Sequence, residues 1–469
     1  MHPLLLLLLG MLIVVGAILW LRQHAFVALL AGGLTVAILT PPAAVERAAR
    51  HQGASEQAAA AQAALHPAER VAAGFGRTAG QLGVMVVMAS LIGAALLTSG
   101  GAERIVRSLL AAVGQARAGL AFLGGGFLLA IPVFFDTVFY LLVPLAKAAR
   151  LRTGGHYVLY VLGIVAGGTM AHSLVPPTPG PLFAASALGV SLTAMIAAGC
   201  AIGTVSASAG YLFARLVDRR LTVPLREPPD RLAELDAISA RPLGQLPPLW
   251  LSLLPILLPI ALITLNSALA PTGLADASSA VHAIAWLGDR TVALVLAAVA
   301  AGGLMWRQVE GEAGRRAIAE AVESAGVIVL ITGAGGAFGA ALQQTGLGAT
   351  LQDMTTAYDL PVLLLAWGLT LTVRTALGSA TVAMITAAGV FGPLASAGGL
   401  GFHPVYLAMA IGCGSKPVWW MNDSGFWVIT RMSGLTESEA LRVLTPMSVV
   451  TGTSGLIATL LGAWLFPFS

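Results

Sequence analysis

The chain has 469 residues, of which 57% are hydrophobic and only 10% are charged, with a net charge of +4. A soluble domain usually carries about 25% charged residues, so a soluble fold of this size could not cover its own surface. These values exclude a soluble enzyme, a disordered chain and a secreted disulfide scaffold. They predict an all-α polytopic membrane protein, whose excess arginine reflects cytoplasmic loops and not a nucleic-acid partner.

Apolar stretches of about 20 residues predict helices that span the lipid bilayer. The first run has no preceding basic residue and no small-residue cleavage site, so it is interpreted as a retained span and not as a signal peptide. The plain spans are predicted at 4–21, 25–40, 78–98, 192–214, 249–270, 290–306, 324–342 and 444–467.

Four further apolar stretches contain helix breakers and polar residues near their middle. They lie at 119–146, 156–190, 361–397 and 404–433. Their interruptions contain, in chain order, Pro132 with Asp136, the proline-rich run 176–181, Arg374 with Gly378 and Ser379, and Lys416 with the run 422–425.

Basic residues orient these segments, because lysine and arginine are enriched in cytoplasmic loops. The linker 215–248 carries six arginines and is predicted to be cytoplasmic. Basic residues flank 119–146 on both sides, which predicts a re-entrant hairpin entered from the cytoplasm. The segment 361–397 has almost no basic flank and is predicted to be a hairpin entered from outside. The loop 41–77 falls outside although it carries four arginines, against the trend.

The chain repeats internally, since residues 92–96 match 338–342 and the pair 99–100 matches 345–346 at the same offset. The predicted halves are 1–214 and 249–469. Each has five crossings and one hairpin (119–146 or 361–397). One of the five crossings is the broken helix (156–190 or 404–433). An odd number of crossings reverses the second half. The sequence thus predicts two inverted-topology repeats, with about ten crossings plus two re-entrant hairpins.

Unwound backbone is costly in lipid and is tolerated only inside protein or beside a water-filled cavity, so the four interruptions are predicted to converge. Helix starts there present N–H groups that suit a carboxylate, and hydroxyl side chains suit a polyhydroxy ligand. The candidate binding residues at the interruptions are Asp136, Thr137, Thr178, Ser379, Thr381, Asn422, Asp423 and Ser424.

Ionisable residues in these apolar stretches sharpen the hypothesis, because a charge at mid-membrane costs roughly 2.5–3.5 kcal/mol. Arg374 either contacts an anion or forms a structural ion pair with Asp136 or Asp423. His172 is either a neutral core histidine or a substrate-binding and proton-carrying residue. Asp136 and Asp423 are candidates to carry a coupling proton. Lys416 can instead lie nearer the interface and snorkel.

Several other chemistries lack support in the sequence. The glycine-rich run 333–339 follows no strand and lacks dinucleotide spacing, so helix packing explains it better. There is no Walker lysine motif, no cysteine–histidine cluster and no nucleophile motif. We therefore expect no cofactor, no metal and no enzymatic activity.

The motifs at the interruptions resemble the gluconate permease family, the gluconate:proton symporters of the ion-transporter superfamily. Residues 374–383 read Arg-Thr-Ala-Leu-Gly-Ser-Ala-Thr-Val-Ala, and 422–427 read Asn-Asp-Ser-Gly-Phe-Trp where the family has Asn-Asp-Pro-Gly-Phe-Trp. His172 precedes Pro-Pro-Thr-Pro-Gly-Pro, where the family has Pro-Pro-His-Pro-Gly-Pro. Asp136 occupies a position at which the family has a glutamate. The resemblance covers nearly the whole chain.

This resemblance implies a secondary active transporter of the bacterial inner membrane. It implies that the substrate is a small sugar acid or hydroxy-carboxylate such as gluconate, imported with a proton. It also implies a homodimer with a moving two-hairpin domain. Thr178 replaces a titratable histidine, and Lys416 adds a cation that favours a more anionic substrate. A dicarboxylate or other organic-anion transporter with different ion coupling, and a passive anion channel, therefore stay open as alternatives.

Overall fold

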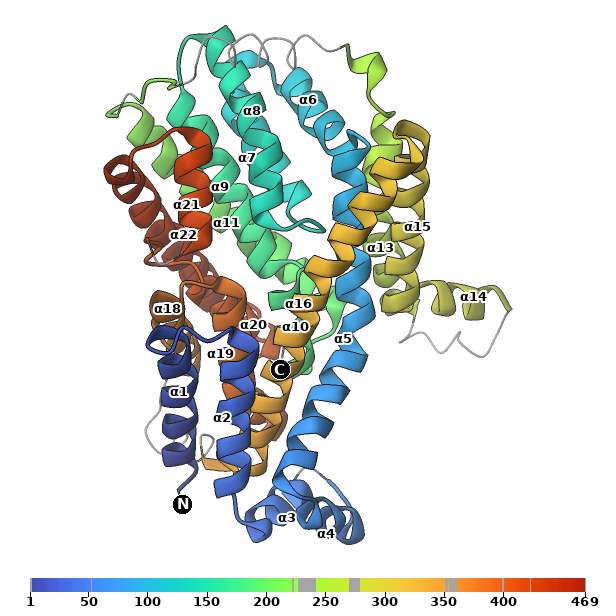
Figure 1. Ribbon diagram of the computed structural model, residues 1–469, viewed down its shortest axis with the longest axis vertical. Helices are drawn as coiled ribbons and strands as arrows, with labels where there is room; N and C mark the ends of the chain where they lie inside the picture. The colour runs from blue at the N-terminus through green and yellow to red at the C-terminus, as the bar shows by residue number, and fades with distance from the viewer. Residues whose placement is uncertain are drawn as a thin grey trace.

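The computed structural model describes residues 2–51, 53–221, 223–226, 242–269, 279–350, 353, 361–398, 400–421 and 423–468. All regular structure in these ranges is helical (Figure 1). Within them, eight helical segments are long and apolar enough to cross a membrane, or up to ten if each of two bent pairs counts as one span. The prediction of an all-α polytopic membrane protein is confirmed. Most of the predicted linker 215–248 lies outside the described residues.

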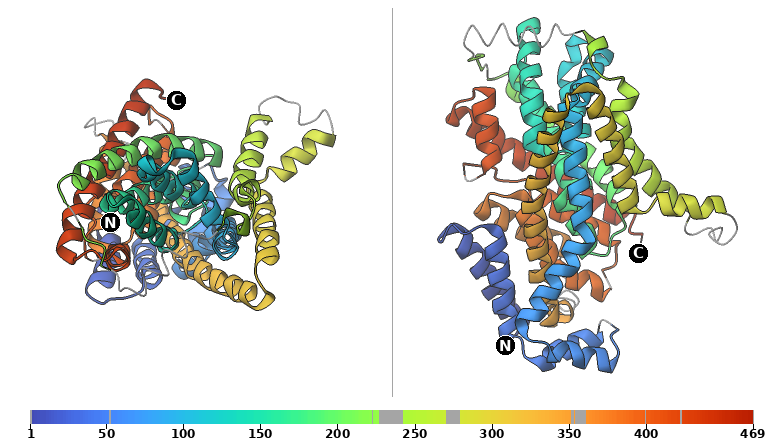
Figure 2. Two further views of the ribbon diagram at one scale, coloured as in Figure 1. Left: turned by 90° about the horizontal axis from the view of Figure 1, so that it is seen from above. Right: turned by 45° about the vertical axis from the view of Figure 1, so that its right-hand side comes forward.

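Two long helices form the centre of the molecule and pack against each other, α5 (Pro67–Thr98) and α16 (Gly311–Gln344). Helix α2 packs on α16 and α15 packs on α5, while α1 packs mainly against α2 and α13 packs against α15. In Figure 2, α13, α14 and α15 stand on one side of the molecule. These outer helices are α1 (Pro3–Leu19), α2 (Ala25–Leu39), α13 (Leu249–Leu269), α14 (Ser279–Leu287) and α15 (Arg290–Gln308).

The four interrupted stretches each form two helices separated by a short break. The predicted hairpins are α7 (Ala118–Leu129) with α8 (Phe135–Thr153), and α18 (Val362–Leu377) with α19 (Ala380–Ala397). The predicted broken helices are α9 (Tyr157–Leu174) with α10 (Pro179–Ala187), and α20 (Pro404–Gly414) with α21 (Ser424–Ser433). Two continuous helices, α11 (Leu192–Asp218) and α22 (Glu437–Leu465), pack against each other beside them.

The two hairpins open toward opposite ends of α22. The hydroxyl of Tyr157, the first residue of α9 after the hairpin, donates to the carbonyl of Ser433 at 2.7 Å. Ser433 is the last residue of α21, shortly before the start of α22. The His403 N–H, just after α19, donates to the Pro467 carbonyl at 2.7 Å, immediately after α22 ends. At 1.5 Å per residue, the ends of α22 lie about 43 Å apart. This arrangement agrees with two halves of opposite orientation. That the halves are inverted-topology repeats stays a prediction.

Three helices begin well before the predicted spans. The predicted loop 41–77 is helical over much of its length, in α3 (Pro42–His51), α4 (Glu56–Ala64) and the first turns of α5. Likewise α16 and α22 begin 13 and seven residues before the predicted starts at 324 and 444. Hydropathy marks only the apolar part of a helix, whereas capping marks its start. Capping boxes at His66 and Thr436 begin α5 and α22 among polar residues.

Helix α7 lies against α9 with almost no side chain between them. A methyl group added at Gly126 would lie 2.8 Å from the Ile164 carbonyl oxygen, and one at Gly163 would lie 3.1 Å from the Gly119 carbonyl oxygen. Small residues allow such close approach of helices in membranes. The first hairpin is thereby held directly on the backbone of the broken helix α9.

We predict that Gly126→Ala destabilises the protein, by about 1–3 kcal/mol, because the new methyl group must displace backbone. Gly124→Ala is the matched control on the same helix, since nothing lies within 4 Å of the added methyl group. Thermal unfolding of both variants in the same detergent measures the difference. Equal melting temperatures would show that the α7–α9 contact is looser than described.

Candidate functional site

A cavity of about 420 Å³ lies where the four interruptions meet. Helices α8, α10, α19 and α21 all begin at its wall, which includes Asp136, Pro179, Ala380 and Ser424. Helix starts carry partial positive charge, so these four ends favour a negatively charged group between them. The volume is within the range of about 300–1,000 Å³ typical of small-molecule sites.

The cavity brings together eight of the ten predicted binding residues. Asn422 lies outside the described residues, and Thr178 is not part of the wall. Lys416 joins the wall and is buried, so it does not snorkel to an interface. The predicted residues on the wall are Asp136, Thr137, His172, Arg374, Ser379, Thr381, Asp423 and Ser424.

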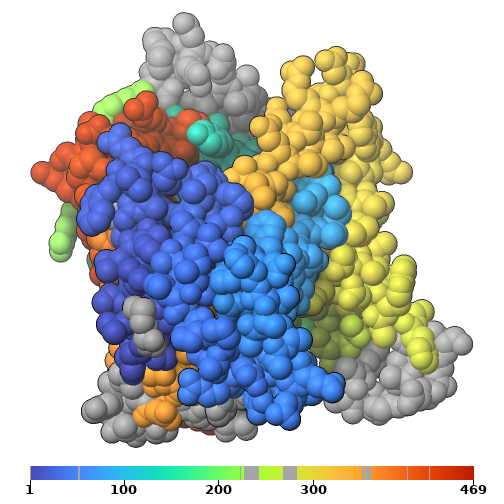
Figure 3. Space-filling view, turned by 60° about the horizontal axis from the view of Figure 1, so that its bottom comes forward, coloured from blue at the N-terminus to red at the C-terminus, as the bar shows by residue number. Residues whose placement is uncertain are grey.

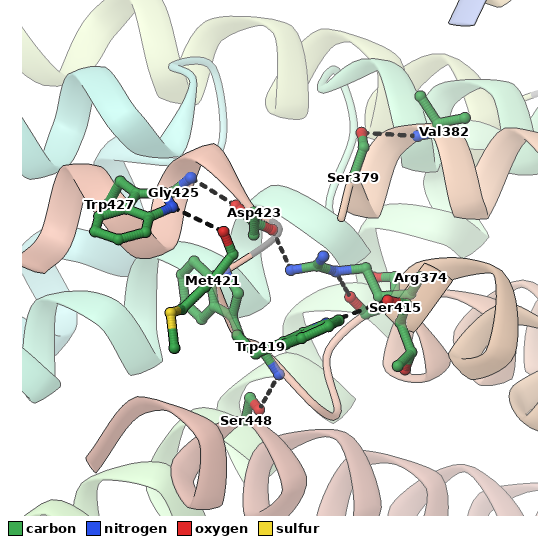
Figure 4. Close-up of polar contacts among 12 residues, drawn as sticks. Arg374, Ser379, Val382, Ser415, Trp419, Met421, Asp423, Gly425, Trp427 and Ser448 are labelled. Atoms are coloured by element: carbon green, nitrogen blue, oxygen red, sulfur yellow. Dashed lines mark hydrogen bonds and ion pairs between the residues drawn. The ribbon is translucent and has the colours of Figure 1, made fainter. Parts of the chain in front are cut away.

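Arg374 and Asp423 form a buried ion pair at the cavity (Figure 4). The Arg374 side chain is 3% exposed, and its Nε donates to the Ser415 carbonyl at 3.0 Å. Asp423 is the N-cap of α21 and accepts from the Gly425 N–H at 2.5 Å through Oδ1. The pair therefore ties the tip of the second hairpin to the break between α20 and α21. It favours the structural interpretation of Arg374, although Nη1 has no partner among the described residues.

Asp136 differs from Asp423 in having no ion-pair partner in the described part of the chain. It lies in the first turn of α8, close enough to Asp423 for the two carboxylates to repel each other. Lys416 lies near Arg374, Asp423 and His172. When all are ionised, two carboxylates and two cations surround the cavity and their formal charges cancel.

His172 lies on the cavity wall, packed against the Phe134 ring with centroids 5.9 Å apart. Its Nδ1 is buried and has no hydrogen-bond partner within the described ranges. A buried nitrogen without a partner is costly, so the position is not explained by core packing alone. Trp419 provides a similar unpaired Nε1 from the break between α20 and α21.

Comparison with known proteins identifies the group to which the chain belongs. Residues 59–465 match the GntP family permease description. The chain belongs to the GntP permease family. It is 32% identical to a gluconate permease of Pseudomonas aeruginosa over 397 residues, covering 83% of this chain and 86% of that protein. It is 31% identical to the low-affinity gluconate transporter of Escherichia coli K12 over 399 residues, covering 83% and 88%.

The Alcanivorax borkumensis YdaH transporter has a similar fold, with a TM-score of 0.61 and 18% identity over 85% of this chain and 88% of that one. This likeness concerns the fold alone. The family and the apolar helices make this GntP family permease a multi-pass transporter of the inner membrane and not an enzyme.

Continuous helices complete the wall of the permease cavity, and sequence reasoning did not assign them to the site. Helix α16 contributes Ser324, Ile328 and Ile331, and α22 contributes Ser448 and Thr451. Neither segment is interrupted: α22 continues through Pro446, and Glu323 lies within the continuous helix α16. A signal existed in α22, where Thr445, Ser448 and Thr451 recur every three residues on one helix face.

Thr178 stabilises a break in the permease without facing the cavity. Its hydroxyl lies 2.8 Å from both the His172 and the Val175 carbonyl oxygens, at the end of α9. These carbonyls would otherwise lack a partner where the helix stops. The structure thus gives Thr178 a contact that accounts for its hydroxyl without a ligand.

We predict that Thr178→Val lowers the melting temperature but leaves substrate affinity within about twofold, because its hydroxyl serves backbone carbonyls. Thr381→Val is the matched comparison, since Thr381 lies on the cavity wall. It should weaken binding several-fold with little change in stability. Thermal unfolding and equilibrium binding of both variants test this assignment, and the reverse pattern would refute it.

Proposed function

We propose that this permease is a secondary active symporter that imports a small hydroxy-carboxylate, such as gluconate, together with a proton. The relatives named as gluconate transporters support the substrate class. The observation that carries the proposal is one cavity that combines converging helix starts, the cations Arg374 and Lys416, and the carboxylate Asp136, which has no ion-pair partner among the described residues.

The substrate carboxylate is proposed to bind at the start of α19, near Ser379 and Lys416. Ser379 is the N-cap of that helix and accepts from the Val382 N–H at 3.3 Å. The carboxylate then gains both the helix dipole and a nearby ammonium group. Hydroxyl groups of the substrate face Thr137, Thr381 and Ser424 on the wall. Asn422 is proposed to form a hydrogen bond with a further hydroxyl group.

Charge balance gives a physical reason for coupling to a proton. The empty cavity is formally neutral when Asp136 is ionised. Adding a monoanion alone makes it negative, and adding a proton alone makes it positive. Adding both restores neutrality. Because moving net charge through the membrane is costly, the empty and the doubly loaded forms are the ones that change access readily.

Asp136 is the proposed proton carrier among the three predicted candidates. Asp423 already serves Arg374 and the Gly425 N–H, so protonating it would weaken both contacts. His172 packs beside Phe134 and adjoins the cavity without an acidic partner in the described ranges. It is proposed to contact substrate. Access would alternate by movement of the two-hairpin domain against the outer helical pairs within a homodimer.

We predict that Asp136→Asn abolishes accumulation driven by a pH gradient, because the variant cavity cannot gain and lose a proton. Substrate binding and exchange of substrate across the membrane should persist. Proteoliposome uptake of radiolabelled gluconate, with and without a pH gradient, measures both activities. Glu312→Gln is the control, since Glu312 forms an exposed ion pair with Arg316. Accumulation by Asp136→Asn at the wild-type level would rule out its role.

A dicarboxylate substrate is the main alternative, and the buried ammonium group of Lys416 is the observation that favours it. We predict that Lys416→Gln weakens the binding of dianions by at least about tenfold and of monoanions less, because a buried charge-assisted contact is lost. Competition by sugar acids, hydroxy acids and dicarboxylates against labelled gluconate provides the comparison.

A passive anion channel is separated from both symport schemes by concentrative uptake. Proteoliposomes that accumulate substrate above the external concentration exclude a channel. If uptake only equilibrates under every imposed ion gradient, symport is wrong for this protein.

A further inference from the structure

A second cavity, of about 370 Å³, lies at the lower end of the molecule in Figure 1, between α4 and the adjoining ends of α5 and α16. It shares no lining residue with the central cavity. Its polar wall consists of two arginines and three glutamines, and no carboxylate lines it among the described residues. These residues are Arg70, Arg77, Gln62, Gln343 and Gln344. Figure 3 tips this end forward, with α1 to α5 in blue.

Arg70 is buried there without a negative partner. Only 5% of the Arg70 surface is exposed. Nη2 donates to the Ala37 carbonyl at 2.9 Å, and Nη1 donates to the Gln344 side-chain oxygen at 3.2 Å. Both acceptors are neutral. Nε is buried and has no partner within the described ranges.

The neighbouring Arg50 shows how carboxylates within the protein balance the charge of an arginine in this region. Its guanidinium contacts Glu46 at 2.6 Å and Glu56 at 2.9 Å. Arg70 lacks such a carboxylate in the described part of the chain, although it is far more buried. An uncompensated buried charge is strongly destabilising, so the contacts of Arg70 to neutral acceptors do not by themselves account for its burial.

We propose that this cavity binds an oxyanion, a phosphate or a carboxylate, between Arg70 and Arg77. The two residues are seven positions apart, which places them on one face of α5 about 10 Å apart along the axis. An anion between them would meet two guanidinium groups, which suit oxyanions. The glutamine amides supply further hydrogen bonds. Such a site would account for Arg70 and Arg77, two of the four arginines in the segment 41–77.

Two sources can supply that chemistry: a free anion in solution, or the phosphodiester headgroup of a lipid. Inorganic phosphate is the probe for the first, measured by the melting temperature of the full-length permease in neutral detergent. We expect phosphate to raise it with saturation. Arg77→Gln should weaken the apparent affinity at least tenfold. Arg77 is exposed and its side chain forms no hydrogen bond or ion pair within the described residues, so the variant should fold.

Arg47→Gln is the matched control, because Arg47 is an exposed arginine on α3 outside the cavity. It removes the same charge and should leave the phosphate response unchanged. Equal losses in both variants would mean a general charge effect and would overturn the proposal.

The lipid source is tested by native mass spectrometry of permease reconstituted with phosphatidylcholine alone or with added phosphatidylglycerol. Selective retention of phosphatidylglycerol that Arg77→Gln removes and Arg47→Gln keeps assigns the site to a headgroup. If neither phosphate nor phosphatidylglycerol shows a response that depends on Arg77, the proposal is wrong. These readouts do not involve transport, so they stand or fail independently of the proposed symport.

Discussion

Lipid offers no hydrogen-bond partners, so the backbone groups at the four interruptions must be satisfied by the protein or by water in the cavity. Side chains near the breaks meet this demand. The Thr178 hydroxyl serves the end of α9, and the Arg374 Nε serves the Ser415 carbonyl at the end of α20. The Trp427 indole donates to the Met421 carbonyl at 2.7 Å. The polar cavity exists because these contacts let helices stop inside the membrane-spanning bundle.

The same contacts settle which polar residues remain for a ligand. Asp423 is used twice, by Arg374 and by the Gly425 N–H, and Thr178 is directed to carbonyls. Asp136 and Lys416 lie on the cavity wall and have no comparable hydrogen-bond or ion-pair partner within the described ranges. The distinction between residues that maintain the breaks and residues that face the cavity follows from hydrogen bonding and not from residue type.

Proline, glycine and charged residues within an apolar stretch indicate directly where a helix stops. The predicted limits 404–433 coincide with the start of α20 and the end of α21. Prediction from the sequence failed where the relevant signal was tertiary. Ser324 and Ile328 belong to an ordinary continuous helix, and only packing brings them to the cavity. Thr178 was predicted from its position at a break, but side-chain direction at a break depends on which carbonyls lack partners.

The cavity has two kinds of wall, and they differ in how freely they can change. On one side, broken helices rely on particular caps, and the α7–α9 seam leaves no room for a methyl group at Gly126. On the other, α16 and α22 keep their backbone hydrogen bonds whatever side chains they carry. Variation at Ser324 or Ile328 can therefore reshape the chamber without removing a backbone hydrogen-bond partner, whereas Ser448 accepts from the Trp419 N–H at the break. Redesign for a longer or bulkier acid has its natural starting point on those two helices.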